Sequence, residues 1–250
     1  MFMKTMKFVG FALMAVLASV GFTACGGDDG DSGGGVPSGK QLVKMTEEYS
    51  SKTYVYDFTY DSQGRVVKVD ITKNGVSNGN YTYAYSTNSI TETHNYSSGS
   101  TSRTQYTLEN GCIVKETRSS SSEMVEYTYN NGYLATKSRI YSGSTTPSRV
   151  YTYSWSNGNL VSESREDKVK TYEYTNYVAP TMCIDLWDLD NNLMGFYGKT
   201  PRNLPSKLID DGSEELTYDW TMNGGFPIKL ILTEKSSKGD DVNIITFEWK

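Results

Sequence analysis

The most complete copy of a repeated unit reads Phe58-Thr59-Tyr60-Asp61-Ser62-Gln63-Gly64-Arg65-Val66-Val67. Two aromatic residues flank a threonine, a polar turn with glycine follows, and an aliphatic pair comes after the turn. Asp-Ser-Gln-Gly and Asn-Gly sequences provide the positive φ angles that tight hairpins need. Each copy of this unit therefore predicts one β-hairpin.

The same unit recurs along the chain. Strong copies begin at Tyr127 and Tyr151, weaker copies begin at Tyr106 and Tyr218, and a degenerate copy without glycine begins at Tyr83. The turn glycines at 64, 111, 132, 158 and 224 are separated by near multiples of about 22 residues. The chain is therefore expected to be an array of hairpins.

The residues on either side of the turns alternate with a period of two. Val125, Tyr127 and Tyr129 share one face of a predicted strand, and Met124, Glu126 and Thr128 share the other. In the same way Val67, Val69 and Ile71 are expected to lie opposite Val66, Lys68, Asp70 and Thr72. This pattern is typical of antiparallel strands with one buried and one wetted face.

A single hairpin is unstable in water, so successive hairpins should pair into one sheet. The runs predict about a dozen to fourteen strands, and a twisted sheet of that size curls or closes to hide its edges. We therefore expect an all-β antiparallel meander of repeated hairpins that forms a strongly curved sheet or a closed, barrel-like fold.

Residues 1–24 have the layout of a bacterial lipoprotein signal peptide. Lys4 and Lys7 precede an apolar and small-residue run from Phe8 to Phe22. This run of about 15 residues is shorter than the roughly 20 that a membrane-spanning helix needs. A retained transmembrane anchor is the alternative interpretation.

Cys25 closes the sequence Phe22-Thr23-Ala24-Cys25, which resembles the lipobox whose cysteine receives the lipid. Phe22 departs from the leucine usual at its place. Residues 25–40 are rich in glycine and aspartate and are expected to form a flexible tether with a reach of roughly 20 Å. The aspartates resemble the surface-export signal of Bacteroidetes lipoproteins; a plain linker is the alternative, and no closing glutamate follows to make a calcium loop.

The predicted mature part forms a single β-repeat domain at 41–250. Without Lys4 and Lys7 the chain keeps 22 basic and 29 acidic residues, a net charge of −7. Phosphate contacts need a dominant basic face, so nucleic-acid binding is not expected. Cys112 and Cys183 could form at most one disulfide, and two separate thiols are the other interpretation.

The segment from Val178 to Pro205 breaks the hairpin rhythm. Apolar residues three to four apart predict a short amphipathic helix near 181–193, after Pro180. We interpret the segment as a cap across an open end of the sheet or barrel. A binding-site loop and a plain surface excursion are the alternatives.

Few residues carry catalytic signatures. His94 is the only histidine, which argues against hydrolytic triads and multi-histidine zinc sites. Asp188, Asp190 and Asn192 imitate the start of a calcium loop, but Leu193 and Lys199 stand where glycine and glutamate are required. No catalytic residue, metal or cofactor is therefore predicted. Glycoside hydrolysis by paired carboxylates remains an alternative, with the strand residues Glu92, Glu116, Glu126, Glu163 and Glu173 as candidates.

Aromatic residues with a polar tip dominate the predicted domain. It has 20 Tyr and 4 Trp but only 4 Phe, because the other Phe residues lie in 1–24. Such rings suit half-wet surfaces, including a polar lumen, a ligand cleft, a sugar-stacking platform or a thin β core. Trp155, Trp187 and Trp220 are the candidate binding residues.

The turn Tyr60-Asp61-Ser62-Gln63-Gly64-Arg65-Val66 resembles the tyrosine-aspartate repeat of Rhs-type proteins. The whole layout is similar to an uncharacterised Bacteroidetes lipoprotein family with a porin-like β fold. The shared features include the lipobox, the tether, the segment 198–207 and the final strand ending Thr246-Phe247-Glu248-Trp249-Lys250. That resemblance implies a fold and a cellular location, but no activity.

These features favour a noncatalytic lipoprotein with a binding or scaffolding role, held in the outer membrane by its acyl chains and facing the cell exterior. Its expected partners are the bilayer and an extracellular glycan, peptide or envelope protein. A membrane-embedded porin-like barrel is one alternative, although alternating Tyr or Val with Lys, Glu, Ser and Thr does not make a lipid-facing band. An envelope glycoside hydrolase is the other.

Overall fold

The computed structural model describes residues 39–180, 193–211, 214–236 and 239–250. These residues form sixteen β-strands and one short 3-10 helix, η1 (Met194–Phe196). The strands are β1 (Leu42–Tyr49), β2 (Lys52–Tyr60), β3 (Val66–Lys73), β4 (Val76–Tyr85), β5 (Ser89–Tyr96), β6 (Thr101–Glu109), β7 (Cys112–Arg118), β8 (Glu123–Asn130), β9 (Tyr133–Tyr141), β10 (Arg149–Ser156), β11 (Asn159–Arg165), β12 (Lys168–Val178), β13 (Asn203–Asp210), β14 (Glu214–Asn223), β15 (Phe226–Ser236) and β16 (Gly239–Trp249).

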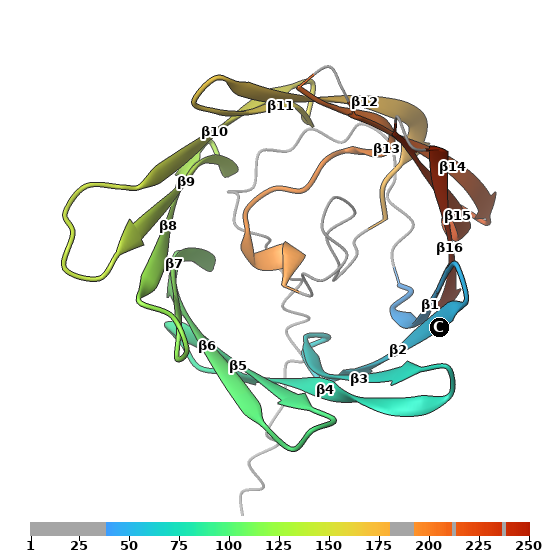
Figure 1. The fold of residues 1–250 in the computed structure, drawn as a ribbon, viewed down its shortest axis with the longest axis horizontal. Coiled ribbons are helices and arrows are strands. Elements are labelled where there is room, and N and C mark those ends of the chain that lie inside the picture. Colours follow the sequence, from blue (N-terminus) through green and yellow to red (C-terminus); the bar gives the residue numbers. More distant parts are fainter. Residues whose placement is uncertain (1–38, 181–192, 212–213, 237–238) are drawn as a thin grey trace, which may run out of the picture.

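The strands form one closed barrel in which each pairs with its neighbours in the chain (Figure 1). β1 pairs with β16, so the sheet has no free edge. Residues 40–250 contain every strand and both members of the closing pair. The predicted antiparallel meander is confirmed. Of the two expected forms, a strongly curved sheet or a closed barrel, the structure adopts the closed barrel. The strand number exceeds the expected dozen to fourteen, because reversals such as Asn74-Gly75 lie outside the repeated unit.

The Asn-Gly turns adopt the predicted geometry. Asn131 has φ 51° and Gly132 has φ 79°, and the same pair of angles recurs at 110–111 and 157–158. Two successive positive φ angles define a type I′ turn, whose twist matches that of the strands it joins. Turn chemistry therefore produces the reversals at one end of the barrel.

Bulges next to these turns correct one prediction about strand faces. Thr59 pairs with Lys68, but Tyr60 pairs with Val66, so Val67 has no partner of its own. Val66 is therefore buried beside Val69 and Ile71, whereas Val67 was expected to join them. A bulge of this kind shifts the alternation by one residue.

Aromatic side chains with a polar tip form a ring of hydrogen bonds near the same turns. Each donates from its O–H or indole N–H to the backbone oxygen of a residue just after the preceding unit's turn or connection. The seven bonds within the described residues, 2.5–2.8 Å long, run from Tyr60 to Leu42, Tyr85 to Val66, Tyr129 to Ile113, Trp155 to Leu134, Tyr174 to Leu160, Trp220 to Pro205 and Trp249 to Pro227. This ring gives a structural role to four of the 20 Tyr and three of the 4 Trp residues, a role that Phe could not fill because it has no donor.

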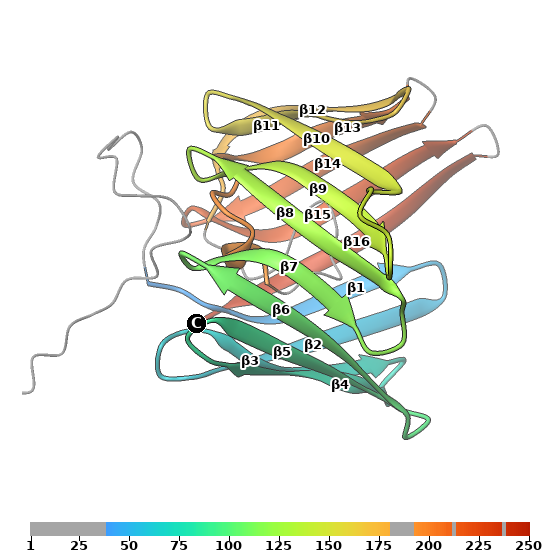
Figure 2. The same cartoon turned by 90° about the vertical axis from the view of Figure 1, so that its left-hand side faces the viewer.

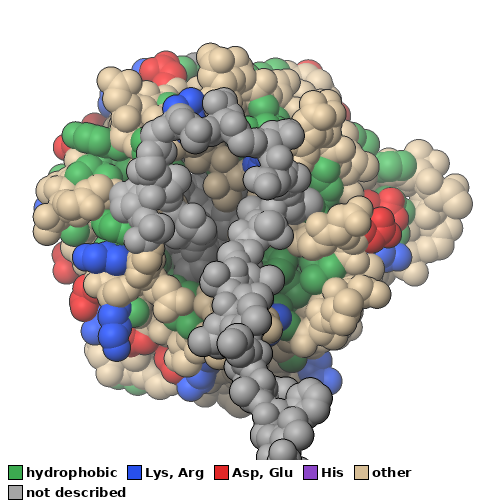
Figure 3. Space-filling view, turned by 180° about the vertical axis from the view of Figure 1, so that it is seen from behind, with side chains coloured by type: hydrophobic (Ala, Val, Ile, Leu, Met, Phe, Trp, Pro, Cys, Tyr) green, Lys and Arg blue, Asp and Glu red, His purple; other side chains and the backbone are tan. Residues whose placement is uncertain are grey.

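The outward face of the wall carries polar side chains together with a few exposed apolar ones, among them Val150, Val169 and Val242. On β6, Thr101, Arg103, Gln105 and Thr107 are all exposed, while the residues between them face inward. Figure 3 shows charged side chains around the circumference of the barrel. Ion pairs cross neighbouring outward positions: Lys44–Asp57 (3.7 Å), Lys207–Glu215 (2.8 Å) and Lys235–Glu215 (2.8 Å).

The inward face carries the apolar core. Ile245, Leu230 and Met45 are at most 1% exposed and lie on the closing side of the barrel. Burying such side chains contributes about 1.5–3 kcal/mol each. The polar outside and apolar inside agree with the predicted alternation on β8, where Val125 and Tyr127 are buried and Glu126 is exposed.

Residues 193–202 cross the interior near the end that holds the C-terminus (Figure 2). Leu193 is 2% exposed and packs in the core, and η1 follows it. The described part of the Val178–Pro205 segment therefore acts as the expected cap. The helix predicted near 181–193 lies outside the described residues, apart from Leu193.

Cys112 is buried and takes part in a disulfide. The prediction of two separate thiols is therefore wrong for Cys112. Cys183 and Cys25 lie outside the described residues. In the described parts of the chain, no helix is long and apolar enough to cross a membrane.

Candidate functional site

A cavity of about 700 Å³ lies inside the barrel and is lined by side chains from β4 to β13 and the cap. It extends from the mid-barrel residues Tyr106 and Tyr127 to Ser120, in the turn between β7 and β8. That turn is at the end opposite the cap. Aromatic rings, carboxylates and cationic side chains line the same cavity.

His94 lies in a stack of aromatic rings on the cavity wall. Its ring centroid is 4.1 Å from that of Tyr81 and 3.9 Å from that of Tyr96. The register explains the stack, because His94 on β5 pairs directly with Tyr81 on β4 and Tyr96 lies two residues further on the same face. His94 therefore lines the barrel interior.

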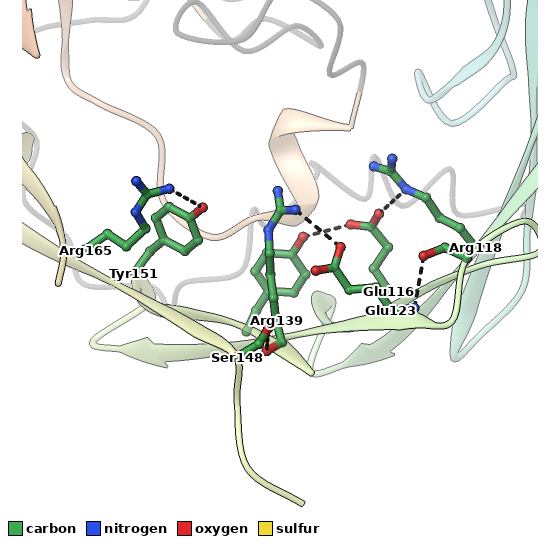
Figure 4. Close-up of polar contacts among 9 residues, drawn as sticks. Glu116, Arg118, Glu123, Arg139, Ser148, Tyr151 and Arg165 are labelled. Atoms are coloured by element: carbon green, nitrogen blue, oxygen red, sulfur yellow. Dashed lines mark hydrogen bonds and ion pairs between the residues drawn. The ribbon is translucent and has the colours of Figure 1, made fainter. Parts of the chain in front are cut away.

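Glu116 is the centre of a buried polar group. Its carboxylate accepts a hydrogen bond from the Tyr127 hydroxyl and one from Arg118 Nε, both 2.8 Å long (Figure 4). The Glu116 side chain is 6% exposed, whereas that of Arg118 is 64% exposed. The guanidinium therefore satisfies a buried carboxylate at one edge and presents its remaining N–H groups to the lumen.

Glu92 on β5 pairs with Thr104 on β6, and Glu116 on β7 pairs with Tyr106 on the same strand β6. Burial raises the pKa of Glu92, hydrogen bonds with Tyr83 and Thr104 oppose the rise, and Glu116 adds to it. Burial also raises the pKa of Tyr106, with both carboxylates adding to the effect. Glu92 therefore takes up a proton more readily than an ordinary glutamate.

Cap residues place further aromatic rings at the end of the barrel that the cap crosses. The Tyr197 ring meets the Tyr127 ring edge-on at 5.1 Å, and burial raises the pKa of Tyr197. Backbone hydrogen bonds hold the cap to the hairpin turns: Lys199 N–H donates to the Gly132 oxygen (2.7 Å) and Arg202 N–H to the Gly158 oxygen (2.9 Å). The repeated turns thus serve as the docking points of the cap.

The predicted tryptophans fall in different places. Trp155 lines the cavity, and its centroid is 4.8 Å from that of Tyr133. Trp220 is 7% exposed, stacks on Phe247 and is not among the residues that line this cavity. Trp187 lies outside the described residues. Trp155 therefore remains a candidate binding residue, while Trp220 lies in the core.

The predicted carboxylates also divide by face. Glu92, Glu116 and Glu163 line the cavity, whereas Glu126 and Glu173 are exposed on the outer wall. The described residues contain no group of three side chains able to hold a metal ion. The acidic stretch 185–192 and the lipidation residue Cys25 lie outside the described residues.

One group was missed from the sequence. Arg139, Arg149 and Arg165 surround the Tyr151 phenol on the inward face of β9, β10 and β11. Partial burial opposes the effect, but the hydrogen bond from Arg165 and the charges of Arg139 and Arg165 lower the pKa of Tyr151, and Arg149 adds to it. The signal was present, since Arg149 and Tyr151 alternate in phase with Tyr153.

No protein-family model matches the chain, and no curated protein sequence matches it. Solved structures do share its fold. A porin-like protein from Bacteroides uniformis has a TM-score of 0.66 at 14% identity, with 84% of this chain and 96% of that chain covered. One from Bacteroides vulgatus has a TM-score of 0.58 at 10% identity, with 85% and 99% covered. The chain is therefore similar in fold to porin-like proteins of Bacteroides, as the resemblance of its whole layout implied. Membership of a lipoprotein family stays a prediction.

Proposed function

We propose that the protein is a noncatalytic binding protein, a porin-like barrel that stands in water and takes a short stretch of glycan into its lumen. The observation that carries this proposal is the arrangement of faces. Ion-paired residues are spread over the outside of the described wall among only scattered exposed apolar side chains, and a ring-lined polar cavity lies inside.

The outer wall argues against a lipid-facing surface. An Arg or Lys on the lipid face of a barrel costs roughly 2–4 kcal/mol at the bilayer midplane. Lys44 pairs across the strands with both Asp57 and Glu248, and Lys68 pairs with Asp70. Such pairs are ordinary features of a wall that faces water.

The cap argues against free passage through the lumen. Phe196 stacks on Tyr85 at 5.7 Å, Lys199 lies over the Tyr133 ring at 5.2 Å, and Tyr197 packs on Tyr127. Contacts from one side of the barrel to another hold the cap across the interior. A ligand would therefore enter and leave by the opposite end.

Glycan is the ligand class that fits the cavity chemistry. A sugar ring has an apolar C–H face that packs on aromatic rings and hydroxyl groups that exchange hydrogen bonds at its edge. Tyr153 and Trp155 supply ring surface, and Glu163 and Lys170 lie on adjacent strands of the same wall. The cavity volume suits a ligand of a few sugar residues.

The binding proposal predicts that Trp155→Ala lowers glycan affinity about tenfold, because one stacking surface is lost. The protein comprising residues 40–250 would be screened for binding on an array of neutral and acidic oligosaccharides. The affinity for each glycan that binds would then be measured by calorimetry. Trp249→Ala is the matched control: Trp249 occupies the same place in the repeat and makes the same bond to a backbone oxygen, but does not line the cavity. No glycan bound by the unaltered barrel, or equal losses in both variants, would count against the proposal.

The address is a second part of the proposal: lipid on Cys25 attaches the barrel to the outer membrane, facing the exterior. A membrane-embedded barrel is the competing function, favoured by the fold shared with porin-like proteins. Replacing residues 1–25 by a cleavable, non-lipoprotein secretion signal distinguishes them. We expect the full chain in the membrane fraction and the altered chain in the soluble fraction without detergent. An altered chain that stays in the membrane would support the embedded barrel.

A further inference from the structure

Two pairs of like-charged residues occupy directly opposed positions on neighbouring strands, near the end of the barrel opposite the cap. Arg139 on β9 pairs with Arg149 on β10, and Arg165 on β11 pairs with Lys168 on β12. Like charges in cross-strand positions destabilise a sheet. An anion bound between these side chains would offset the repulsion between them.

The carboxylates of the described residues neutralise this group only in part. Glu123 forms an ion pair with Arg139 at 3.2 Å. Glu163 and Glu166 act on Arg165 at longer range, but no carboxylate in the described ranges forms an ion pair with Arg149 or Arg165. Arg165 instead donates to the Tyr151 hydroxyl, at 3.4 Å. Arg149 and Arg165 therefore have guanidinium N–H donors that are not used in ion pairs with the described carboxylates.

Arg139 also has one donor that no described residue satisfies. Its Nε atom is buried and has no hydrogen-bond partner within the described residues. A buried donor without a partner costs roughly 1–3 kcal/mol. Figure 4 shows the guanidinium groups of Arg139 and Arg165 extending from the wall toward the inside of the barrel.

The group lies next to the cavity on the same wall. Lys137 lines the cavity and pairs with Tyr151, and Arg139 is two residues further along β9 toward the open end. Two residues of a strand span about 7 Å, a distance that one to two sugar residues cover. A ligand whose sugar rings lie in the cavity would therefore place its next substituent among the arginines.

We propose that Arg139, Arg149 and Arg165 form an anion subsite for a carboxylate or sulfate group, so that the preferred ligand is an acidic glycan. Guanidinium forks bind such groups through two parallel hydrogen bonds, and an anion would also relieve the repulsion between Arg139 and Arg149. The part of this inference that concerns glycan rests on the proposed function, whereas the anion subsite itself does not.

A first experiment tests the subsite without any sugar. Residues 40–250 are titrated with sodium sulfate at constant ionic strength, with sodium chloride as the reference, and the arginine Nε–H signals are followed by NMR. We expect sulfate to shift the signals of Arg139 and Arg165, and Arg149→Gln to weaken this response severalfold. Equal responses to both salts would overturn the anion subsite.

A second experiment compares trigalacturonate with its fully methyl-esterified form, which has the same rings without charge. We expect at least tenfold tighter binding of the acid, and loss of that preference in Arg139→Gln and Arg165→Gln but not in Lys229→Gln, an outward residue on β15. Equal binding of both sugars would overturn the acidic preference and leave the proposed function standing. A sulfate response without binding of any glycan would overturn the proposed function and leave the anion subsite.

Discussion

Trp220→Ala is expected to lower the free energy of unfolding by about 3–5 kcal/mol, the range for removing a large aromatic side chain from a core. Trp220 is 7% exposed, stacks on Phe247 and donates its indole N–H to the Pro205 oxygen at 2.7 Å. The truncation leaves a cavity and an unpaired backbone oxygen. Urea denaturation of residues 40–250, followed by far-UV circular dichroism, measures the change.

Trp220→Phe serves as the control, because it keeps a ring and removes only the N–H donor. We expect it to cost about 1–3 kcal/mol, the penalty for leaving a buried acceptor without its partner. A loss after Trp220→Ala no larger than that after Trp220→Phe would show that Trp220 does not pack as described. Trp155→Ala should cost less than Trp220→Ala, since Trp155 is partly exposed to the cavity.

Gly198→Ala is expected to release the cap from the end of the barrel. Gly198 has φ +92°, and a Cβ there would lie 2.6 Å from the Gly132 oxygen and 3.1 Å from the Tyr129 ring. The backbone strain alone costs roughly 1–3 kcal/mol, and the contact with a backbone oxygen adds to it. Hydrogen exchange at the Lys199 amide, which donates to that same oxygen, should rise at least tenfold.

Gly195→Ala provides a matched control within the same cap. A Cβ at Gly195 meets nothing within 4 Å, and its φ lies outside the strained positive range. Its exchange rates and its cleavage by protease within 193–202 should match those of the unaltered chain. Equal behaviour of the two variants would mean that close packing at Gly198 does not hold the cap.

Much of the fold follows from local chemistry. Asn131 and Gly132 adopt positive φ because the twist of a two-residue hairpin requires it, and both residues tolerate that conformation. The alternation on β8 likewise places Tyr127 inside and Glu126 outside. Hairpins, turns and the face of most residues could therefore be predicted from short stretches of sequence.

The bulges show where local reasoning stops. Val66 and Val67 have the same chemistry, and only the pairing of Tyr60 with Val66 decides which of them turns inward. The candidate site was equally hard to predict. Residue type could not separate the cavity-lining Glu92, Glu116 and Glu163 from the outward Glu126 and Glu173. The alternation along a strand could not separate them either, because each bulge shifts it by one residue.

The sequence by itself determined the unit of construction: a hairpin with an Asn-Gly or related turn, a period of two, and a Tyr or Trp before most of the repeated turns. Those features are local, because turn angles and side-chain alternation depend on neighbouring residues. The tertiary structure decided that β1 meets β16, that Trp155 faces the cavity while Trp220 lies in the core, and that Arg139, Arg149 and Arg165 surround one phenol. Closure depends on the twist and register accumulated over all sixteen strands, which no single unit specifies.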